Sequence, residues 1–347
     1  MKRRAGSVSS FGIGEVLLVG CVVWGISTVA PVLLKPADLK SSTVNGVASD
    51  AIMKIHSDSS GRELWVLRGI SELVKLDLKS HQSETVYHNH DFSITNVCVS
   101  RDSSTHLLTL QNHETLVFRG GEVIAYEQSF DSEPQRCSLS ADGNMAICIS
   151  GGTLVKCWNL AGDEVVAVDF DVPERVETIG VDPAGRKLVI SSVSEGVKVY
   201  DVLTGNLLQT LISGETVARS LAISPDGRWL ATNRCSSLAL YDFQTGDLIW
   251  EEQAVGLDYF GNVTISPDGS RVAMTSRKYG LRILDRENGR ILRDFPKVSL
   301  GCKVAFAPSS DKFYSGNIDG SIGIWSVSDG QELGHLNAGV SPAKSAH

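Results

Sequence analysis

The sequence lacks the short motifs that mark the common enzyme classes. It contains no phosphate-binding P-loop, no GxGxxG dinucleotide fingerprint, no GxSxG nucleophile elbow and no HExxH metal motif. Its seven cysteines include no CxxC pair and have no regular spacing, which argues against a metal cluster. We therefore expect no catalytic residues, no metal and no cofactor.

The chain also lacks the excess of basic residues that nucleic-acid binding requires. It carries 32 Lys and Arg against 40 Asp and Glu, for a net charge of −8 at pH 7. Residues 1–40 carry five Lys or Arg against two acidic residues, so the remainder has a net charge of −11. Because an acidic surface repels phosphate backbones, nucleic acid is not an expected partner.

What the sequence does contain is an internal repeat. The turn Ser224-Pro225-Asp226-Gly227 recurs 42 residues later as Ser266-Pro267-Asp268-Gly269. Weaker copies occupy residues 100–103, 140–143, 182–185 and 307–310. A period of about 40 to 45 residues is typical of radially repeated β architectures, because one unit cannot bury its own sheet face alone.

Each repeat contains the pattern of four short antiparallel strands. In the clearest unit, strands are expected at 220–223, 229–232, 238–242 and 248–250. Pro225 presets φ at the second position of the first turn, and Gly227 supplies the positive φ that ends it. The pattern of a third strand followed by a glycine turn recurs seven times, which predicts seven blades over residues 51–337.

These units resemble those of the WD-repeat β-propeller family, and the resemblance covers all seven copies. The family's Trp-Asp dipeptide is represented by Trp158-Asn159, Tyr200-Asp201, Tyr241-Asp242, Leu284-Asp285 and Trp325-Ser326. The Gly-His pair that opens a family repeat is present only as Gly334-His335. The resemblance implies an all-β, seven-bladed β-propeller of four-stranded antiparallel blades. Because an outer strand is predicted at 332–336, ring closure does not require an N-terminal strand, although Val44 to Val47 could still add to an edge.

An apolar segment precedes the repeats. Residues 11–34 carry one formal charge, Glu15, and about 20 apolar residues suffice to span a bilayer as a helix. The basic segment 1–10 favours a cytoplasmic N-terminus and an extracytoplasmic propeller. We therefore expect a single-pass membrane protein, with a linker at 35–50 and a flexible tail at 338–347. A cleaved signal peptide and a buried structural helix are the alternatives.

Two clusters have both an ordinary and a functional interpretation. The cysteines are expected to be buried hydrophobic residues, with a Cys148–Cys157 disulfide as the alternative for an oxidising compartment. His88, His90 and Asp91 are expected to form an ordinary exposed loop, although two His side chains on an extended segment could share a metal.

The candidate binding residues lie on the longer connections, which should share one face of the ring. Tyr, Phe and Arg on loops are typical of interaction hot spots. The predicted partner-binding residues are Tyr259, Phe260, Arg277, Tyr279, Arg234, His90 and Phe92. They predict a scaffold that docks a protein or peptide without catalysis of its own.

A second set of residues supports an alternative function. Arg136, Arg219 and Lys303 stand at equivalent strand starts in different repeats and could form a basic rim for an anion in the central channel. The alternatives to a scaffold are therefore a propeller that binds a small ligand or an anion, and, third, a hydrolase or lyase with its residues in the channel.

Overall fold

The computed structural model describes residues 51–89, 91–127, 134–162, 165–173, 175–214, 217–234, 237–253, 260–298, 303–317 and 319–338. The predicted membrane helix at 11–34, its flanking segments 1–10 and 35–50, and residues 339–347 of the tail lie outside these ranges, so those assignments stay predictions. Within the described ranges, no helix is long and apolar enough to cross a membrane.

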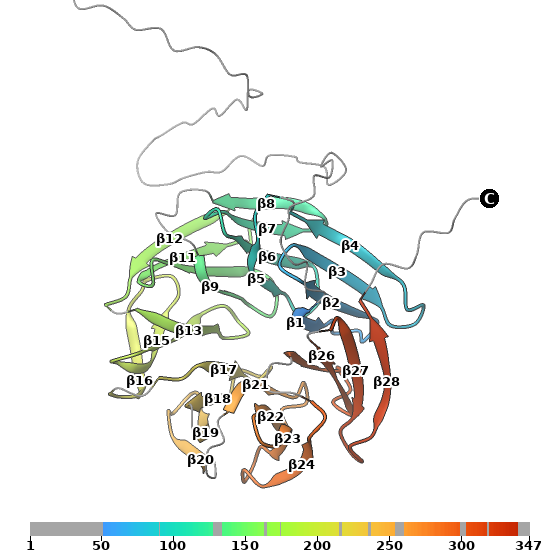
Figure 1. Cartoon of the computed structure of the whole chain (residues 1–347). Helices are drawn as coiled ribbons and strands as arrows, with labels where there is room; N and C mark the ends of the chain where they lie inside the picture. Colours follow the sequence, from blue (N-terminus) through green and yellow to red (C-terminus); the bar gives the residue numbers. More distant parts are fainter. Residues whose placement is uncertain are drawn as a thin grey trace, which may run out of the picture.

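The described chain forms 28 strands in seven four-stranded antiparallel sheets, arranged as blades around a central axis (Figure 1). The strands of blades 1 to 3 are β1 (Ile52–Ser57), β2 (Glu63–Arg68), β3 (Glu72–Asp77), β4 (Ser83–His88), β5 (Ile94–Val99), β6 (Thr105–Leu110), β7 (Thr115–Arg119), β8 (Glu122–Glu127), β9 (Pro134–Leu139), β10 (Met145–Ser150), β11 (Leu154–Asn159) and β12 (Val166–Asp171). The strands of blades 4 to 7 are β13 (Val176–Val181), β14 (Lys187–Ser192), β15 (Gly196–Asp201), β16 (Leu207–Ile212), β17 (Ser220–Ile223), β18 (Trp229–Arg234), β19 (Ser237–Asp242), β20 (Leu248–Gln253), β21 (Phe260–Ile265), β22 (Arg271–Ser276), β23 (Gly280–Asp285), β24 (Ile291–Phe295), β25 (Lys303–Phe306), β26 (Lys312–Gly316), β27 (Ser321–Ser326) and β28 (Glu332–Asn337). The predicted seven-bladed architecture is confirmed.

Among the described strands, none is exchanged between the first and last blades where the ring closes. Every blade takes its four strands from one continuous stretch of sequence, and blade 7 has the order β25-β26-β27-β28. At the seam, the Ile52 amide donates to the Asn317 carbonyl over 2.9 Å. Gly316 belongs to the same seam, because a Cβ there would lie 2.2 Å from Cγ2 of Ile52. The expectation that blade 7 supplies its own outer strand is confirmed.

The repeated turn between the first and second strands has a common hydrogen-bonding scheme. In blade 5, the Ser224 hydroxyl donates to Asp226 and accepts the Trp229 amide over 2.9 Å. Blades 2, 3 and 6 repeat this arrangement at Ser100, Ser140 and Ser266. In blades 1 and 4, Asp58 and Asp182 accept the equivalent amide with a carboxylate oxygen. The sequence repeat therefore encodes a side-chain acceptor for this amide in blades 1 to 6, whereas blade 7 has Ala307 at the equivalent position.

The aspartate that ends many third strands shapes the second turn of the blade. The Asp201 carboxylate accepts the amides of Leu203 and Thr204 at 3.1 and 2.9 Å. Asp242 does the same for Gln244 and Thr245. This accounts for the aspartate of the degenerate dipeptides, because an acceptor at the strand end folds the chain back into the outer strand.

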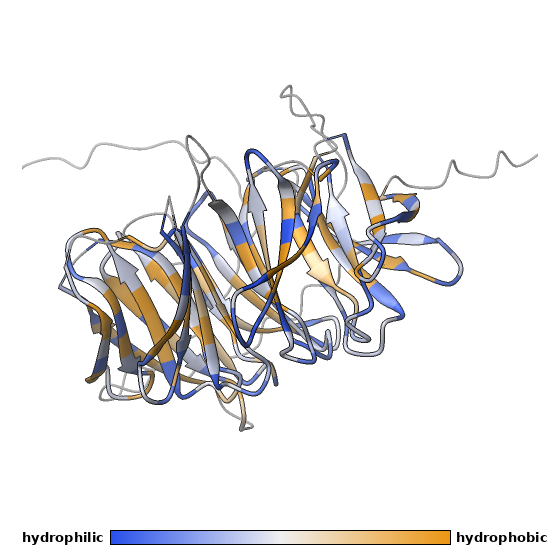
Figure 2. Ribbon diagram, turned by 90° about the horizontal axis from the view of Figure 1, so that it is seen from below, coloured by the Kyte–Doolittle hydropathy of each residue, from blue (hydrophilic) through white to orange (hydrophobic). Residues whose placement is uncertain are grey.

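The hydrophobic core consists of layers between neighbouring blades. Apolar residues occupy the centres of the stacked sheets and polar residues the turns (Figure 2). Between blades 6 and 7, for example, the Trp325 ring stacks on Phe313 at 6.2 Å and meets Phe295 edge to face. Each blade therefore buries its faces only against its neighbours, as the repeat period predicts.

The predicted alternative of a Cys148–Cys157 disulfide is wrong. Cys148 faces Lys156 across β10 and β11, while Cys157 faces Ile147. An offset of one residue in a strand turns side chains to opposite faces of the sheet. Accordingly, Cys148 packs against blade 2 and Cys157 against blade 4, and both are free thiols that belong to the core.

Candidate partner-binding face

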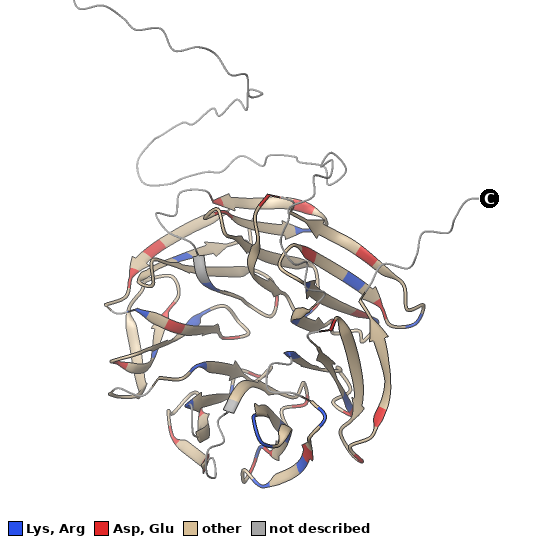
Figure 3. Ribbon diagram, in the orientation of Figure 1, with Lys and Arg blue, Asp and Glu red and all other residues tan. Residues whose placement is uncertain are grey.

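The strand order divides the turns between the two faces of the ring. The turns between first and second strands and between third and fourth strands lie on one face, because successive strands of a blade are antiparallel. The turns between second and third strands, together with the connections between blades, lie on the other, which we call the loop face. Acidic and basic residues are interspersed around the ring (Figure 3).

The blade 6 hairpin on this face brings together an aromatic residue and two exposed cations. Arg277, Lys278 and Tyr279 connect β22 to β23. The Ser276 hydroxyl accepts the amides of Lys278 and Tyr279 at 3.2 and 3.0 Å, which fixes the start of the turn. Gly280 ends it with a φ of +76°, and a Cβ there would lie 2.1 Å from the Phe295 carbonyl oxygen. The hairpin conformation therefore depends on glycine.

The Tyr279 ring packs against the guanidinium of a buried arginine. The Arg282 guanidinium carbon lies 3.9 Å from the centre of the Tyr279 ring, and Lys278 Nζ lies 4.8 Å from it. Arg282 is 7% exposed and makes a bidentate ion pair with Asp294 of β24, at 2.7 and 3.2 Å. A hydrogen bond from Lys278, together with the charges of Lys278 and Arg282, lowers the pKa of the Tyr279 hydroxyl.

Arg234 occupies the corresponding corner of blade 5, and its guanidinium is already engaged. Its Nη2 donates to the Tyr241 hydroxyl over 2.5 Å, and its Nη1 lies 3.6 Å from Glu251. Burial raises the pKa of Tyr241, so this hydroxyl stays protonated. Arg234 therefore supports the blade, whereas Arg277 and Lys278 are exposed to solvent.

The other predicted partner-binding residues are only partly described. The backbone of Phe260 pairs with Ser276 at the end of β22, so the start of β21 adjoins the blade 6 hairpin. Tyr259 and His90 lie outside the described residues, as does the side chain of Phe260. Phe92 is 44% exposed on the loop face between blades 1 and 2. Its backbone N–H donates to Asn89 Oδ1 over 2.8 Å.

The three cations of the predicted anion rim are not equivalent. Arg136 lies within β9, and its Nε donates to the Glu177 carbonyl of the next blade over 2.5 Å. Lys303 begins β25 at the corresponding place, four residues before the turn. Arg219 precedes β17 and is exposed. Lys54, which sequence reasoning did not single out, occupies the place of Arg136 in blade 1.

Sequence reasoning also missed Arg282 and Asp294. The available signal was a cation in the middle of an apolar third strand. It recurs as Lys75, Lys156 and Lys198, each of which makes an ion pair with a nearby carboxylate. Arg282 differs from these lysines because its planar guanidinium can hold a carboxylate and lie over an aromatic ring together.

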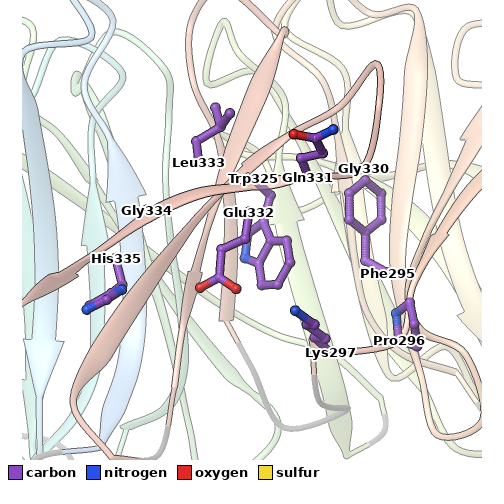
Figure 4. A pocket seen from close by; sticks show the side chains of 10 residues that line it. All are labelled: Phe295, Pro296, Lys297, Trp325, Gly330, Gln331, Glu332, Leu333, Gly334 and His335. Carbon is purple, nitrogen blue, oxygen red and sulfur yellow. The ribbon is translucent and has the colours of Figure 1, made fainter.

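A groove of about 870 Å³ opens between blades 6 and 7. Its lining combines aromatic and polar side chains, and the Trp325 indole is flanked by Glu332 and Phe295 (Figure 4). The complete lining is Phe295, Pro296, Lys297, Trp325, Gly330, Gln331, Glu332, Leu333, Gly334 and His335. Among the described residues, no three His, Cys, Asp or Glu side chains come together as a metal site.

Comparison with known proteins relates the chain to WD-repeat proteins. No family model matches it. It is 28% identical over 123 residues to periodic tryptophan protein 2 of Saccharomyces cerevisiae, covering 35% of this chain and 13% of that protein. It is 24% identical over 185 residues to protein groucho of Drosophila melanogaster (50% and 25% covered), and 23% identical over 175 residues to WD repeat-containing protein 82 of the same fly (47% and 54%). The matches thus span about half or less of these curated relatives.

Solved structures share the fold over nearly their whole length. A chain in the crystal structure of a mitotic checkpoint complex aligns with a TM-score of 0.67 at 12% identity, covering 93% of this chain and 99% of that one. The Cps50 (Swd1) β-propeller domain of Myceliophteria thermophila aligns with a TM-score of 0.68 at 17% identity, covering 82% and 99%. At such identities the likeness shows the propeller fold alone.

Proposed function

We propose that this protein is a membrane-anchored propeller scaffold that docks a protein or peptide partner on its loop face and has no catalytic activity of its own. The observation that carries the proposal is the blade 6 hairpin, in which Arg277, Lys278 and Tyr279 are presented on a rigid support. Tyr and Arg are the residue types enriched at interaction hot spots.

The support beneath the hairpin favours binding. Tyr279 is positioned by Arg282, whose guanidinium is fixed by Asp294. A side chain that is already ordered loses little conformational entropy when a partner covers it. The hairpin therefore has the rigidity of a docking element, which a mobile loop of the same composition would lack.

The charge of the hairpin suggests the chemistry of the partner. Arg277 and Lys278 are both exposed on a chain whose net charge is −8. A local basic patch on an acidic protein steers oppositely charged groups toward itself and repels other basic proteins. We therefore infer a partner segment that carries carboxylates beside an apolar or aromatic residue.

The anchor in this proposal is the apolar segment 11–34. Its length suits a single bilayer crossing, and Lys2, Arg3 and Arg4 favour a cytoplasmic N-terminus with an extracytoplasmic propeller. Alkaline extraction of membranes that contain the full chain tests the anchor, because only integral proteins stay in the pellet. Release into the supernatant would contradict the anchor, and protease digestion of sealed vesicles reports the side on which the propeller lies.

The comparisons support a binding role without specifying a partner. One of the solved chains of similar fold belongs to an assembly, the mitotic checkpoint complex. Several sequence relatives are named as WD-repeat proteins. Because these matches are remote, the partner of this chain has to be identified by experiment.

The test is quantitative capture of partners from detergent-solubilised membranes, with the full chain as bait. Arg277→Glu should lose a protein that the wild type captures in stoichiometric amount. Arg290→Glu is the matched control, because it makes the same charge change at an exposed arginine of blade 6 on the opposite face. Equal capture by all three baits would contradict docking at the hairpin.

The second candidate function is anion binding in the central channel. Lys54, Arg136 and Lys303 at equivalent inner-strand places favour it. If neither the wild type nor the variants capture a partner, titration calorimetry with inorganic phosphate tests this alternative. Arg136→Gln should then weaken phosphate binding.

A further inference from the structure

Two cysteines from neighbouring blades meet near the central axis. Cys98 on β5 of blade 2 and Cys137 on β9 of blade 3 are 39 positions apart, and their Sγ atoms lie 3.2 Å apart. The Cys98 Sγ also lies 3.3 Å from the Cys137 carbonyl oxygen, to which the thiol donates a hydrogen bond. Both residues are half-buried.

Positions equivalent to Cys98 and Cys137 occur on the first strands of neighbouring blades at every interface, but only the interface of blades 2 and 3 has a cysteine at both. At the interface of blades 4 and 5 the places hold Gly180 and Leu221, and a Cβ on Gly180 would lie 4.0 Å from Cβ of Leu221. At the interface of blades 3 and 4 the equivalent residues are Ser138 and Ile179. Blade geometry thus brings these two places into contact, and the sequence of blades 2 and 3 puts a sulfur at each.

A third thiol lies next to the pair but is less accessible. Cys148 on β10 is the direct cross-strand neighbour of Cys137, so both face blade 2. Cys148 is fully buried, and burial raises the pKa of its thiol well above the usual range. A buried thiol that stays protonated is a poor nucleophile, so Cys148 is the natural comparison residue for the pair.

We propose that Cys98 and Cys137 form a redox-active dithiol, a modification site at which hydrogen peroxide or a small organic disulfide oxidises the two thiols to a disulfide that joins blades 2 and 3. This site is independent of partner docking on the loop face, so either proposal can fail without the other.

The chemistry proceeds in two balanced steps with hydrogen peroxide. The Cys98 thiolate attacks one peroxide oxygen, the O–O bond breaks, and the hydroxide that leaves takes a proton to become water, while Cys98 becomes a sulfenic acid. Cys137 Sγ then attacks Cys98 Sγ; the S–S bond forms, the S–O bond breaks, and the hydroxide leaves as water with the Cys137 proton. In total the two thiols lose two electrons and two protons, and one peroxide becomes two waters.

With an organic disulfide the same electrons move by exchange. The Cys98 thiolate attacks one sulfur of the oxidant and expels the other as a thiolate, and Cys137 then displaces the remaining half. The products are the protein disulfide and two small thiols. To reach the bond length of about 2.05 Å, the Sγ atoms must approach by roughly 1 Å, which side-chain rotation can supply.

The local environment assigns the first step to Cys98. The hydrogen bond from the Cys137 thiol and the charge of Lys54 outweigh the effect of burial and lower the pKa of Cys98 to about 7. The same hydrogen bond, together with burial, raises the pKa of Cys137. A thiol that is partly ionised at neutral pH beside a protonated one has the arrangement of an attacking and a resolving cysteine.

The first test locates the bond in the wild-type full chain. Detergent-solubilised protein at low concentration is treated with hydrogen peroxide or oxidised glutathione, the free thiols are alkylated, and the protein is digested with trypsin. Peptide 80–101 contains Cys98, and peptide 137–156 contains both Cys137 and Cys148. We expect the two peptides to be joined, with a mass two hydrogens below their sum, and fragmentation to place the bond at Cys137.

Variants complete the test. The cross-link should persist in Cys148→Ser and disappear in both Cys98→Ser and Cys137→Ser. Oxidation should raise the thermal unfolding midpoint of the wild type and of Cys148→Ser, because the bond closes a loop across two blades, and should leave Cys98→Ser unchanged. The proposal is overturned if the oxidised wild type shows no joined peptides, or if the bond is placed at Cys148 and persists in Cys137→Ser.

Discussion

The indole of Trp250 in blade 5 covers Gly289 in blade 6, so that a Cβ on Gly289 would lie 2.8 Å from the ring. The Trp250 Nε1–H also donates to the Arg286 carbonyl in the same turn over 2.7 Å. The arrangement recurs in the neighbouring blades, where Gln209 donates to the Thr245 carbonyl and Arg293 to the Asp329 carbonyl, each over 3.0 Å. Outer strands of blades 4 to 6 are thus tied to the turn of the next blade.

We predict that Gly289→Ala destabilises the protein more than Gly269→Ala does. Both glycines have a φ near +70°, so both substitutions carry the left-handed penalty of about 1 to 2 kcal/mol. Gly269 has open space around its would-be Cβ, whereas Gly289 meets the Trp250 ring. Overpacking of this kind adds roughly 1 to 3 kcal/mol. Urea unfolding of both variants measures the difference, and equal losses would show that the Trp250 contact is not tight.

A second prediction concerns the turn repeat. Ser224→Ala should lower the free energy of unfolding by about 1 to 3 kcal/mol, because the buried Trp229 amide loses its acceptor. The double change Ser224→Asp with Asp226→Ser should retain most of the stability, because it reproduces blade 1, where Asp58 accepts the equivalent amide and Ser60 donates to Asp58. The exposed Ser213→Ala is the control, and thermal unfolding ranks the four proteins. A Ser224→Ala variant as stable as the control would contradict the assigned role.

These turns explain why the fold could be predicted from sequence and the sites only in part. A Ser-Pro-Asp-Gly turn makes its hydrogen bonds within about five residues, so its chemistry is visible in the sequence. The Cys98–Cys137 contact and the Trp250 contact join residues in different blades, and their geometry depends on the angle between sheets. Local periodicity carries no information about that angle. The Cys148–Cys157 prediction was wrong for a related reason, since a register offset of one residue cannot be read from spacing alone.

The support of the blade 6 hairpin can be tested without a partner. The pKa of Tyr279 is lowered by Lys278 and Arg282, so its phenol should ionise at lower pH than an isolated tyrosine. Ultraviolet difference titration of the wild type against Tyr279→Phe isolates this residue among the seven tyrosines. Lys278→Gln should raise the pKa toward the ordinary value, and Lys79→Gln on the opposite face should leave it unchanged. A transition insensitive to Lys278→Gln would contradict the contact.

The interface of blades 1 and 2 contains two histidines that resist protonation. His106 lies against the Trp65 ring at 4.1 Å, and the Nε2 atoms of His56 and His106 are buried without a hydrogen-bond partner among the described residues. Burial lowers the pKa of each imidazole from 6.5 to about 4. His56 and Lys75 lower the pKa of His106 further, while Asp58 and Asp102 act in the opposite direction on His56 and His106 respectively.

This depression predicts a loss of stability in mild acid. Between pH 4 and 6.5 the two histidines of the unfolded chain bind protons that the folded imidazoles do not. The free energy of unfolding therefore falls as the pH is lowered through that window, and it has its full value above pH 6.5. At about 1.4 kcal/mol per pKa unit, each imidazole contributes roughly 3 kcal/mol at neutral pH. The carboxylates of Asp58 and Asp102, whose pKa values hydrogen bonds lower against the effect of burial, keep their full contribution throughout this window and lose it only at lower pH. Urea unfolding at pH 7, 6, 5 and 4.5 should show this dependence of the free energy of unfolding on pH.

His56→Gln and His106→Gln should each reduce the slope of that dependence, because glutamine does not titrate, whereas His335→Gln on the exposed edge of β28 should leave it unchanged. An equal slope in all four proteins would mean that the two imidazoles are solvated and that acid sensitivity originates elsewhere.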